Sequence, residues 1–255
     1  MYFVFDVETV LDDALARRWL QLPPDASDDE TETRMAEAWP HLSIPKSPFH
    51  RVVAVAGALV APDGSLRRLT ALGSADDDEA ALVAAFFRAA ETPGLTLVGW
   101  NSGAFDLPVL WYRAMHHGIS ARRFYDIRGI RYRYGEEGHL DLMDWLSGFG
   151  ASSRVSLDEM AALVGVPGKL GITGSDVAAL WRAGAVEEIR RYCETDVLTT
   201  VLVLGAWAHH RGAFDADALA RLHASARTFL EERRQAPTWG AYLDAWDARR
   251  SNPRG

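Results

Sequence analysis

The sequence has a single cysteine, Cys193, in 255 residues. One cysteine excludes an internal disulfide framework and a cysteine-rich zinc site, and it favours a reducing compartment. The eight histidines follow no zinc-ligand spacing. No apolar run is long enough to span a membrane, and residues 2–10, YFVFDVETV, contain two acids and lack the basic start of a signal peptide. We therefore expect a cytoplasmic protein without membrane contacts.

Basic residues are in the minority, with 27 Lys and Arg against 35 Asp and Glu and a formal net charge of -8. This balance disfavours nucleic-acid binding, which normally needs a basic face. Residues 121–134, ARRFYDIRGIRYRY, are the exception, because five arginines are interleaved with four aromatic residues. The segment is typical either of a surface that binds a nucleic-acid backbone and stacks on bases, or of a solvated loop with arginine stems packed over aromatics.

The apolar content, 48% of residues, is sufficient for a full α/β core. Alternation and apolar runs predict strands at residues 2–10, 51–60, 66–71 and 95–100, and a strand or strand-to-helix junction at 139–146. Helical spacing and capping residues predict helices at 76–90, 101–117, 156–165, 175–183, 185–210, 215–234 and 238–248. The stretch between the first two strands, through Pro48, is predicted to be a long surface loop. Strands dominate early and helices late, which indicates a mixed sheet flanked by helices.

Two acids lie inside the first predicted strand. Asp6 and Glu8 are two residues apart, so a strand places both side chains on one face of the sheet. Carboxylates held together among apolar residues are unstable unless they are protonated or neutralised by cations. The same D-x-E spacing occurs by chance at residues 28–30 and 77–79. The apolar strand context is therefore what distinguishes Asp6 and Glu8.

Further candidates follow later elements. Asp106 lies where an apolar strand leads into a helix, a common position for sites in α/β sheets, although an acid there also complements the helix dipole. Tyr192 and Asp196 are four residues apart in the long helix and share one face beside an apolar stripe. Each pattern is common by itself, and only their order along the chain makes them specific.

In that order, FDVET, NSGAFD and YCETD resemble the three motifs of the DEDD (DnaQ-like) exonuclease superfamily, in its tyrosine branch, DEDDy. The chain is most similar to the predicted exonucleases that resemble the proofreading domain of family-B DNA polymerases, over roughly residues 2–205. The resemblance implies an α/β, ribonuclease-H-like fold with a mixed five- to six-stranded sheet flanked by helices. It also implies an exonuclease domain at residues 1–210, followed by a helical extension at 211–255 packed on the same domain.

The resemblance further implies a 3′-5′ exonuclease that hydrolyses phosphodiester bonds at the 3′ ends of single-stranded DNA or RNA with two Mg²⁺ or Mn²⁺ ions. By the family pattern the ions would be held by Asp6, Glu8, Asp106 and Asp196. Tyr192 would orient the attacking water. The sister branch has a histidine five residues before the last aspartate, and this chain has an arginine there.

Some residues have two interpretations. Asn101 and Phe105 match family positions near the scissile nucleotide, but a helix cap and a core aromatic explain them equally well. Asp141 and Asp144 are either acids behind the site or residues that end a strand and begin a helix. The glycine-rich segment that starts at Gly168 lacks the spacing of a phosphate-binding Walker loop.

Two other functions stay open. The acidic net charge favours a catalytically silent module that keeps the fold and binds nucleic acid or protein. An internally cutting, metal-dependent nuclease would use the same carboxylates but needs an open channel instead of a pocket for a 3′ end. No sequence pattern identifies a polymerase or repair partner.

Overall fold

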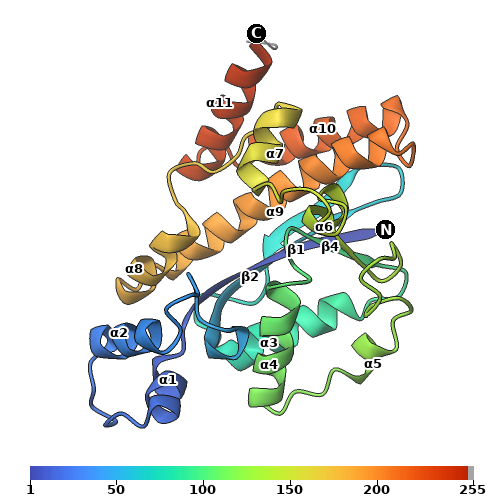
Figure 1. Cartoon of the computed structure of the whole chain (residues 1–255). Coiled ribbons are helices and arrows are strands. Elements are labelled where there is room, and N and C mark those ends of the chain that lie inside the picture. The colour runs from blue at the N-terminus through green and yellow to red at the C-terminus, as the bar shows by residue number, and fades with distance from the viewer. Residues whose placement is uncertain (252–255) are drawn as a thin grey trace.

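A computed structural model describes residues 1–251. Its centre is a five-stranded mixed sheet with helices on both faces, as the sequence predicts (Figure 1). The strands are β1 (Tyr2–Leu11), β2 (His50–Val60), β3 (Leu66–Ala71), β4 (Thr96–Gly99) and β5 (His139–Asp141), in the order β3-β2-β1-β4-β5. β1 pairs antiparallel with β2 and parallel with β4, so the centre of the sheet joins a hairpin to a parallel pair.

The helices fall into two groups along the chain, and the longest, α9, α10 and α11, are in the second. The first group is α1 (Asp13–Leu20), α2 (Asp28–Ala38), the 3-10 turn η1 (Ser47–Phe49), α3 (Glu79–Ala90), α4 (Asp106–His116) and α5 (Arg122–Tyr125). The second is α6 (Leu142–Leu146), α7 (Leu157–Val164), η2 (Gly174–Asp176), α8 (Val177–Arg182), α9 (Val186–His210), α10 (Ala216–Glu231) and α11 (Pro237–Ser251). No helix within residues 1–251 combines the length and the apolar character that crossing a membrane requires.

The sheet separates two hydrophobic cores. Successive strand residues point to opposite faces, so Val4 and Val10 of β1 pack in the core that contains α9, whereas Phe3 and Phe5 pack with α3 and α4. The α9 side also takes buried side chains from α7, α10 and α11. The two C-terminal helices therefore share one core with the sheet.

Most predicted elements are confirmed, including the 156–165 helix. Ser156 accepts from the Glu159 N–H, and the Glu159 carboxylate accepts from the Ser156 N–H, which is a capping box. The hairpin of β2 and β3 turns at Asp63 and Gly64, as its Pro-Asp-Gly sequence predicts.

The long surface loop predicted through Pro48 is wrong, because the stretch contains α1 and α2. Asp12 and Ser27 cap these helices by accepting the N–H groups of the third residue beyond. Ala16, Met35 and Phe49 then form a small separate core. Few residues of the two helices are buried, namely Ala16 of α1 and Thr31 and Met35 of α2.

The helix predicted from residue 101 begins later, at Asp106. Residues 101–105 form a turn instead, and Asn101 has a left-handed φ of 61°. Asn101 therefore does not cap the helix. Pro108 consequently lies in the first turn of α4, where its missing N–H leaves no intrahelical hydrogen bond unmade.

Candidate active site

β1 directs Asp6 and Glu8 to the side of the sheet that α9 covers. Both residues have the parity of Val4 and Val10, which lie in the core shared with α9. The pairing with β2 shifts by one residue directly after Glu8, so a β-bulge lies beside these acids. Bulges bend a strand and re-aim its side chains, and they are frequent next to active sites.

The turn between β4 and α4 brings Asp106 to the same place. β4 pairs with β1 only along Tyr2–Val4, which leaves the later N–H groups on that edge of β1 without a strand partner. The N–H of Val7 donates to Asp106 Oδ1 at 3.1 Å. Asp106 thus satisfies the open edge of β1 and lies close enough to Asp6 to raise its pKa by charge repulsion.

α9 supplies the third group of side chains from its buried face. Tyr192 and Cys193 are buried, and the Tyr192 hydroxyl hydrogen-bonds to the Asp196 carboxylate. The Cys193 thiol lies 3.3 Å from the Asp6 carbonyl oxygen and 3.5 Å from Asp6 Oδ2. Burial raises the pKa of this thiol, so Cys193 is a neutral hydrogen-bond donor to Asp6.

Of the four acids Asp6, Glu8, Asp106 and Asp196, called the carboxylate cluster below, Glu8 and Asp106 are buried and Asp6 and Asp196 are half-buried. Burial raises the pKa of Asp106 to about 7 and that of Asp196 to about 6. Burial and the neighbouring acids raise the pKa values of Asp6 and Glu8 well above their usual range. Within residues 1–251, none of the four forms an ion pair. An arrangement of this kind needs protons or external cations.

The cluster fits divalent metal ions. One oxygen each of Asp6 and Glu8 and the sulfur of Cys193 lie within 4.8 Å of one another. Carboxylate oxygens are the ligands that Mg²⁺ and Mn²⁺ prefer, whereas a neutral thiol is a poor ligand for them. The donor set therefore suits hard cations held by the acids, with Cys193 outside the ligand set.

Lys169 is a site residue that the sequence analysis missed. Its ammonium lies over the Tyr192 ring, 5.9 Å from the centroid, and its charge lowers the pKa values of Glu8 and Asp196 against the effect of burial. The Lys169 N–H donates to the Asp158 carboxylate at 2.9 Å, which holds this segment against the start of α7. The available signal was that the chain has only two lysines among its 27 basic residues.

Asp141 holds the turn that precedes Asp106. Its carboxylate accepts the N–H of Asn101 at 3.0 Å and of Gly103 at 2.9 Å, and it also caps α6 through the Met143 N–H. The two interpretations of Asp141 are therefore both correct, because it ends β5 and supports the site. Asp144 lies apart from the cluster and forms ion pairs with arginines.

Asn101 and Phe105 lie on this turn. The Asn101 Oδ1 atom is buried without a hydrogen-bond partner, so a polar group remains available beside the cluster. The Phe105 ring packs edge-on against His50, with centroids 4.9 Å apart. His50 in turn hydrogen-bonds to Thr9 at 2.8 Å, which links the turn to the end of β1.

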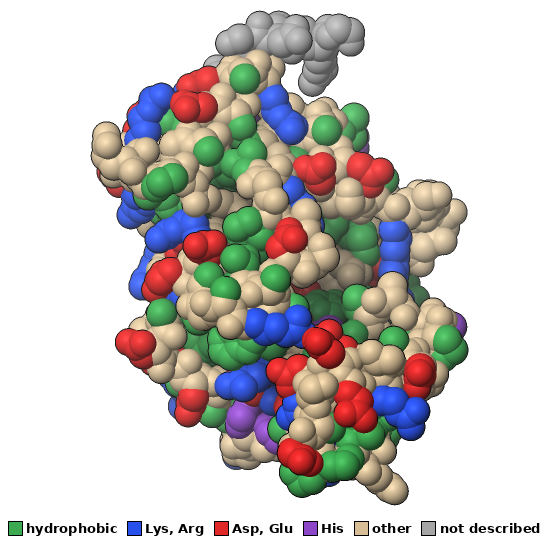
Figure 2. Space-filling model, turned by 90° about the vertical axis from the view of Figure 1, so that its left-hand side faces the viewer, with side chains coloured by type: hydrophobic (Ala, Val, Ile, Leu, Met, Phe, Trp, Pro, Cys, Tyr) green, Lys and Arg blue, Asp and Glu red, His purple; other side chains and the backbone are tan. Residues whose placement is uncertain are grey.

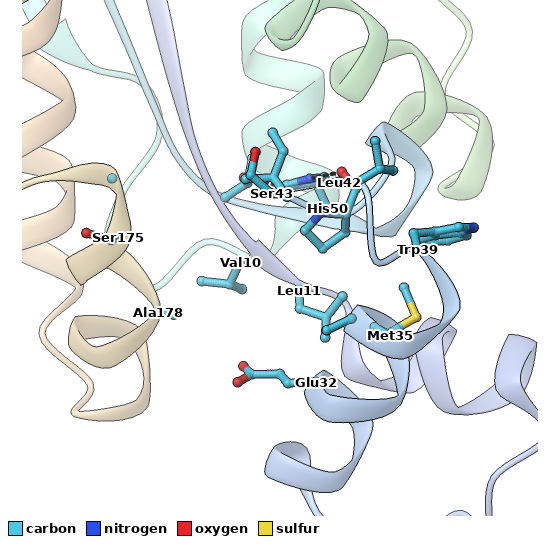
Figure 3. Close-up of a pocket in the computed structure, with 15 residues that line it drawn as sticks. Val10, Leu11, Glu32, Met35, Trp39, Leu42, Ser43, His50, Ser175 and Ala178 are labelled. Carbon is cyan, nitrogen blue, oxygen red and sulfur yellow. Dashed lines mark hydrogen bonds between the residues drawn. The ribbon is translucent and has the colours of Figure 1, made fainter.

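An apolar cavity of about 320 Å³ begins where β1 leaves the cluster. Its walls come from Val10 and Leu11 of β1, from Met35 and Trp39 of the α2 region, and from the start of α8 (Figure 3). His50 lies along one side of it. The unpredicted α1–α2 unit thus forms a wall of this cavity, which lies beside the carboxylates and does not contain them.

Comparisons with known proteins agree with this geometry. Residues 43–246 match the family described as "Predicted 3'-5' exonuclease related to the exonuclease domain of PolB". The match includes Asp106, Tyr192 and Asp196 but begins after Asp6 and Glu8. It also extends through α10 and much of α11, where the resemblance was expected to end.

The fold is also found in a solved polymerase. The chain is similar to the family B DNA polymerase from the hyperthermophilic archaeon Pyrobaculum calidifontis, with a TM-score of 0.53 and 19% identity. The similarity covers 81% of this chain and 24% of the polymerase chain. At this identity it supports the fold alone, and it confirms the predicted ribonuclease-H-like α/β architecture. No curated protein matches the chain.

The family match covers well over half of the sequence, and it includes the α4 and α9 residues that the fold brings to the carboxylate cluster. The chain belongs to the family of predicted 3′-5′ exonucleases related to the exonuclease domain of PolB.

Proposed function

We propose that this protein is a metal-dependent 3′-5′ exonuclease that removes nucleotides from single-stranded DNA or RNA by a two-metal-ion mechanism. The observation that carries the proposal is the convergence of four carboxylates from β1, α4 and α9, two buried and two half-buried, with no ion pair to any of them within residues 1–251. The family membership supports the reaction, and the donor set supports Mg²⁺ or Mn²⁺.

Asp6, Glu8, Asp106 and Asp196 would hold the two ions. Bound there, the metal would lower the pKa of a water molecule and stabilise the charge that develops on the phosphate oxygens. The Tyr192 pKa is raised by burial and by the nearby acids, so its phenol stays protonated and can position the nucleophile by hydrogen bonding. Tyr192 is therefore assigned an orienting role and not that of a general base.

The substrate residues follow from the same geometry. The unpartnered Asn101 amide can bind the terminal nucleotide, and the Phe105 ring can contact its sugar or base. The apolar cavity beyond Glu8 has the size and lining of a small-ligand pocket and is the place for the 3′-terminal base.

We further propose that residues 1–210 form the exonuclease domain and that residues 211–255, of which 252–255 lie outside the described residues, form an extension packed on it. The buried side chains of α10 and α11 in the core around α9 support this packing. A cytoplasmic location is proposed as well, because the one cysteine is a buried free thiol. The partner of this protein is a 3′ end, with no polymerase or repair protein assigned.

The test is an assay of purified protein on 5′-labelled single-stranded DNA and RNA with Mg²⁺ or Mn²⁺. We expect a ladder of products that shortens from the 3′ end. The matched control is the Asp6→Ala variant, purified in the same way. Activity that does not exceed this control on either strand with either metal contradicts the enzyme and favours a silent binding module.

A circular single strand separates the remaining alternative. An exonuclease leaves it intact, because a circle has no 3′ end to enter the pocket. Cleavage of the circle at a rate similar to that of the linear strand contradicts the exonuclease and favours an internally cutting nuclease.

A further inference from the structure

We propose that residues 122–134, together with Arg154, bind the single strand on the 5′ side of the bond that is cut. This inference rests on the proposed function and adds to it a surface outside the carboxylate cluster. The surface, called the β5-edge surface below, includes α5 and the chain that follows it toward β5, at one edge of the sheet.

Charge is the first reason. Residues 121–134 contain five arginines and one acid in a chain of net charge -8. Arg122, Arg123 and Arg131 are exposed, and within residues 1–251 none of them forms an ion pair. Exposed arginines without ion-pair partners can bind phosphates and release the counterions of the nucleic acid. No ion pair within the protein has to be broken for this. The surface is therefore complementary to a nucleic-acid backbone although the protein as a whole is acidic.

Aromatic rings are the second reason. Tyr125, Tyr132 and Tyr134 are 49%, 62% and 57% exposed, respectively, which is unusual for large rings in a folded protein. The Tyr132 and Tyr134 rings lie 6.1 Å apart, and Tyr134 packs on Phe149 at 4.8 Å. Such rings offer faces on which successive bases can stack regardless of sequence.

A connection toward the carboxylate cluster is the third reason. A cavity of about 200 Å³ is lined by Arg131, Arg133 and Arg154 on one side and by Gly103 and Ala104 on the other. These two small residues belong to the turn that leads directly into Asp106. The cavity thus extends from the β5-edge surface to the turn that precedes Asp106, although none of the four cluster carboxylates lines it.

The polar groups of this cavity can accommodate an anion. Arg133 Nε binds Asp144 Oδ2 at 2.6 Å, and Arg154 Nη2 binds Asp144 Oδ1 at 3.3 Å. With Arg131, three arginines face the two carboxylates of Asp144 and Asp141, and Asp141 accepts hydrogen bonds from backbone N–H groups. The buried Nε1 atom of Trp111, which also lines the cavity, has no hydrogen-bond partner. A backbone phosphate would supply an acceptor for such donors.

The 5′-to-3′ direction of the bound nucleic-acid strand follows from the positions of the two cavities. The apolar cavity begins after Glu8, and the arginine-lined cavity ends before Asp106, so they flank the carboxylate cluster. α5 lies across the molecule from α1, α2 and α8 (Figure 1). The face that carries α1, α2 and α8 mixes acidic and basic side chains without a continuous basic area (Figure 2). The strand therefore runs from the β5-edge surface at its 5′ side to the apolar cavity at its 3′ end.

The test compares a strand of about 20 nucleotides with a dinucleotide that has the same 3′ nucleotide. The variants are Arg131→Gln and Tyr132→Ala, which change exposed side chains and leave the Asp144 ion pairs intact. Arg68→Gln is the matched control, because Arg68 is an exposed arginine on β3, at the opposite edge of the sheet. We expect the ratio of kcat/KM for the long strand to that for the dinucleotide to fall about tenfold in each variant and to stay constant in the control.

Binding supplies a second measurement that does not need catalysis. Fluorescence anisotropy with the Asp6→Asn protein and a labelled nucleic-acid strand gives Kd at several salt concentrations. The slope of log Kd against the logarithm of the salt concentration should fall by about 0.7 when Arg131→Gln is added to this protein. An equal loss on both substrates indicates a structural defect and overturns the inference, as does an unchanged ratio with an unchanged slope. A protein without nuclease activity whose binding still shows the slope change contradicts the proposed function and leaves the surface in place.

Discussion

Two groups of acids in this protein differ in whether a basic side chain neutralises them. In the first group, called the Arg113 cluster below, Arg113 donates from Nε to Glu79 Oε1 at 2.6 Å and from Nη2 to Glu79 Oε2 at 2.5 Å. Arg113 Nη1 also forms an ion pair with Asp12 Oδ2 at 2.8 Å. The Val52 N–H and His117 complete the partners of Glu79. The carboxylate cluster has two buried and two half-buried acids that form no ion pair within residues 1–251, and the charge of Lys169 acts on Glu8 and Asp196.

The pKa values follow this difference. In the Arg113 cluster, burial acts to raise the pKa of Asp12, but the Leu15 N–H and Arg113 outweigh it and lower the pKa overall. In the carboxylate cluster, burial is only partly offset by hydrogen bonds and by Lys169, and the pKa values of all four acids are raised. Neutralisation inside the chain is typical of a structural site, and missing neutralisation is typical of a site that binds a ligand.

The largest effect is expected from Arg113→Met, which would make the Arg113 cluster resemble the carboxylate cluster. Glu79 and Asp12 would remain buried without their cation, and we expect the free energy of unfolding in urea to fall by about 3–5 kcal/mol. The control Arg88→Met changes an exposed arginine of α3 and should stay within about 0.5 kcal/mol of the unmodified protein. Equal stability of the two variants would show that the Arg113 cluster is not structural.

A bound metal ion should neutralise the carboxylate cluster, as Arg113 neutralises Glu79 and Asp12. We expect Mn²⁺ at a hundred times its dissociation constant to raise the free energy of unfolding by about 2.7 kcal/mol per ion, because the unfolded chain lacks the site. Thermal unfolding with and without chelator measures the effect. Asp6→Asn is the control and should lose most of the increase. The same increase in this variant would place the metal elsewhere.

Without metal, the stability of the protein should depend on pH through Asp106. The folded pKa of about 7 lies above the unfolded value near 4, so the folded state binds more protons between these pH values. Stability therefore falls as the pH rises from about 4 to 7. Asp106→Asn keeps an oxygen acceptor for Val7 and should be about 4 kcal/mol more stable than the unmodified protein at pH 8, with the difference vanishing near pH 4. An Asp106→Asn variant less stable at both pH values would contradict this expectation.

The smallest effect is expected from Tyr192→Phe, which removes a hydroxyl from the edge of the carboxylate cluster. Because Tyr192 is assigned to the water and not to the metal, the variant should keep the Mn²⁺-dependent increase in stability. Its kcat should fall about tenfold, the consequence of a less well-placed nucleophile. Single-turnover kinetics and thermal unfolding together test this assignment. Loss of the metal effect would instead make Tyr192 part of the metal site, and an unchanged kcat would remove it from the mechanism.

The elements that were predicted well have strong local signals. β1 is an uninterrupted apolar run, α7 begins with a capping box, and α9 is a long helix without proline or glycine over its first 19 residues. The α1–α2 unit was missed because its small core depends on Phe49, which arrives from outside the helices. The turn at 101–105 was missed because Asp141, far along the chain, supplies the hydrogen bonds that hold it.

The sequence by itself determined the fold class, the positions of most helices and strands, and which acids were candidates, because apolar periodicity and capping act between near neighbours. Only the tertiary structure decided that these acids lie together, buried or half-buried, without an ion pair within residues 1–251, whereas the buried Glu79 is neutralised by Arg113. It also placed Lys169 beside Tyr192 and connected the arginines of the β5 edge to the turn before Asp106. Burial and charge proximity depend on contacts between residues that are distant in the chain, and no local pattern contains them.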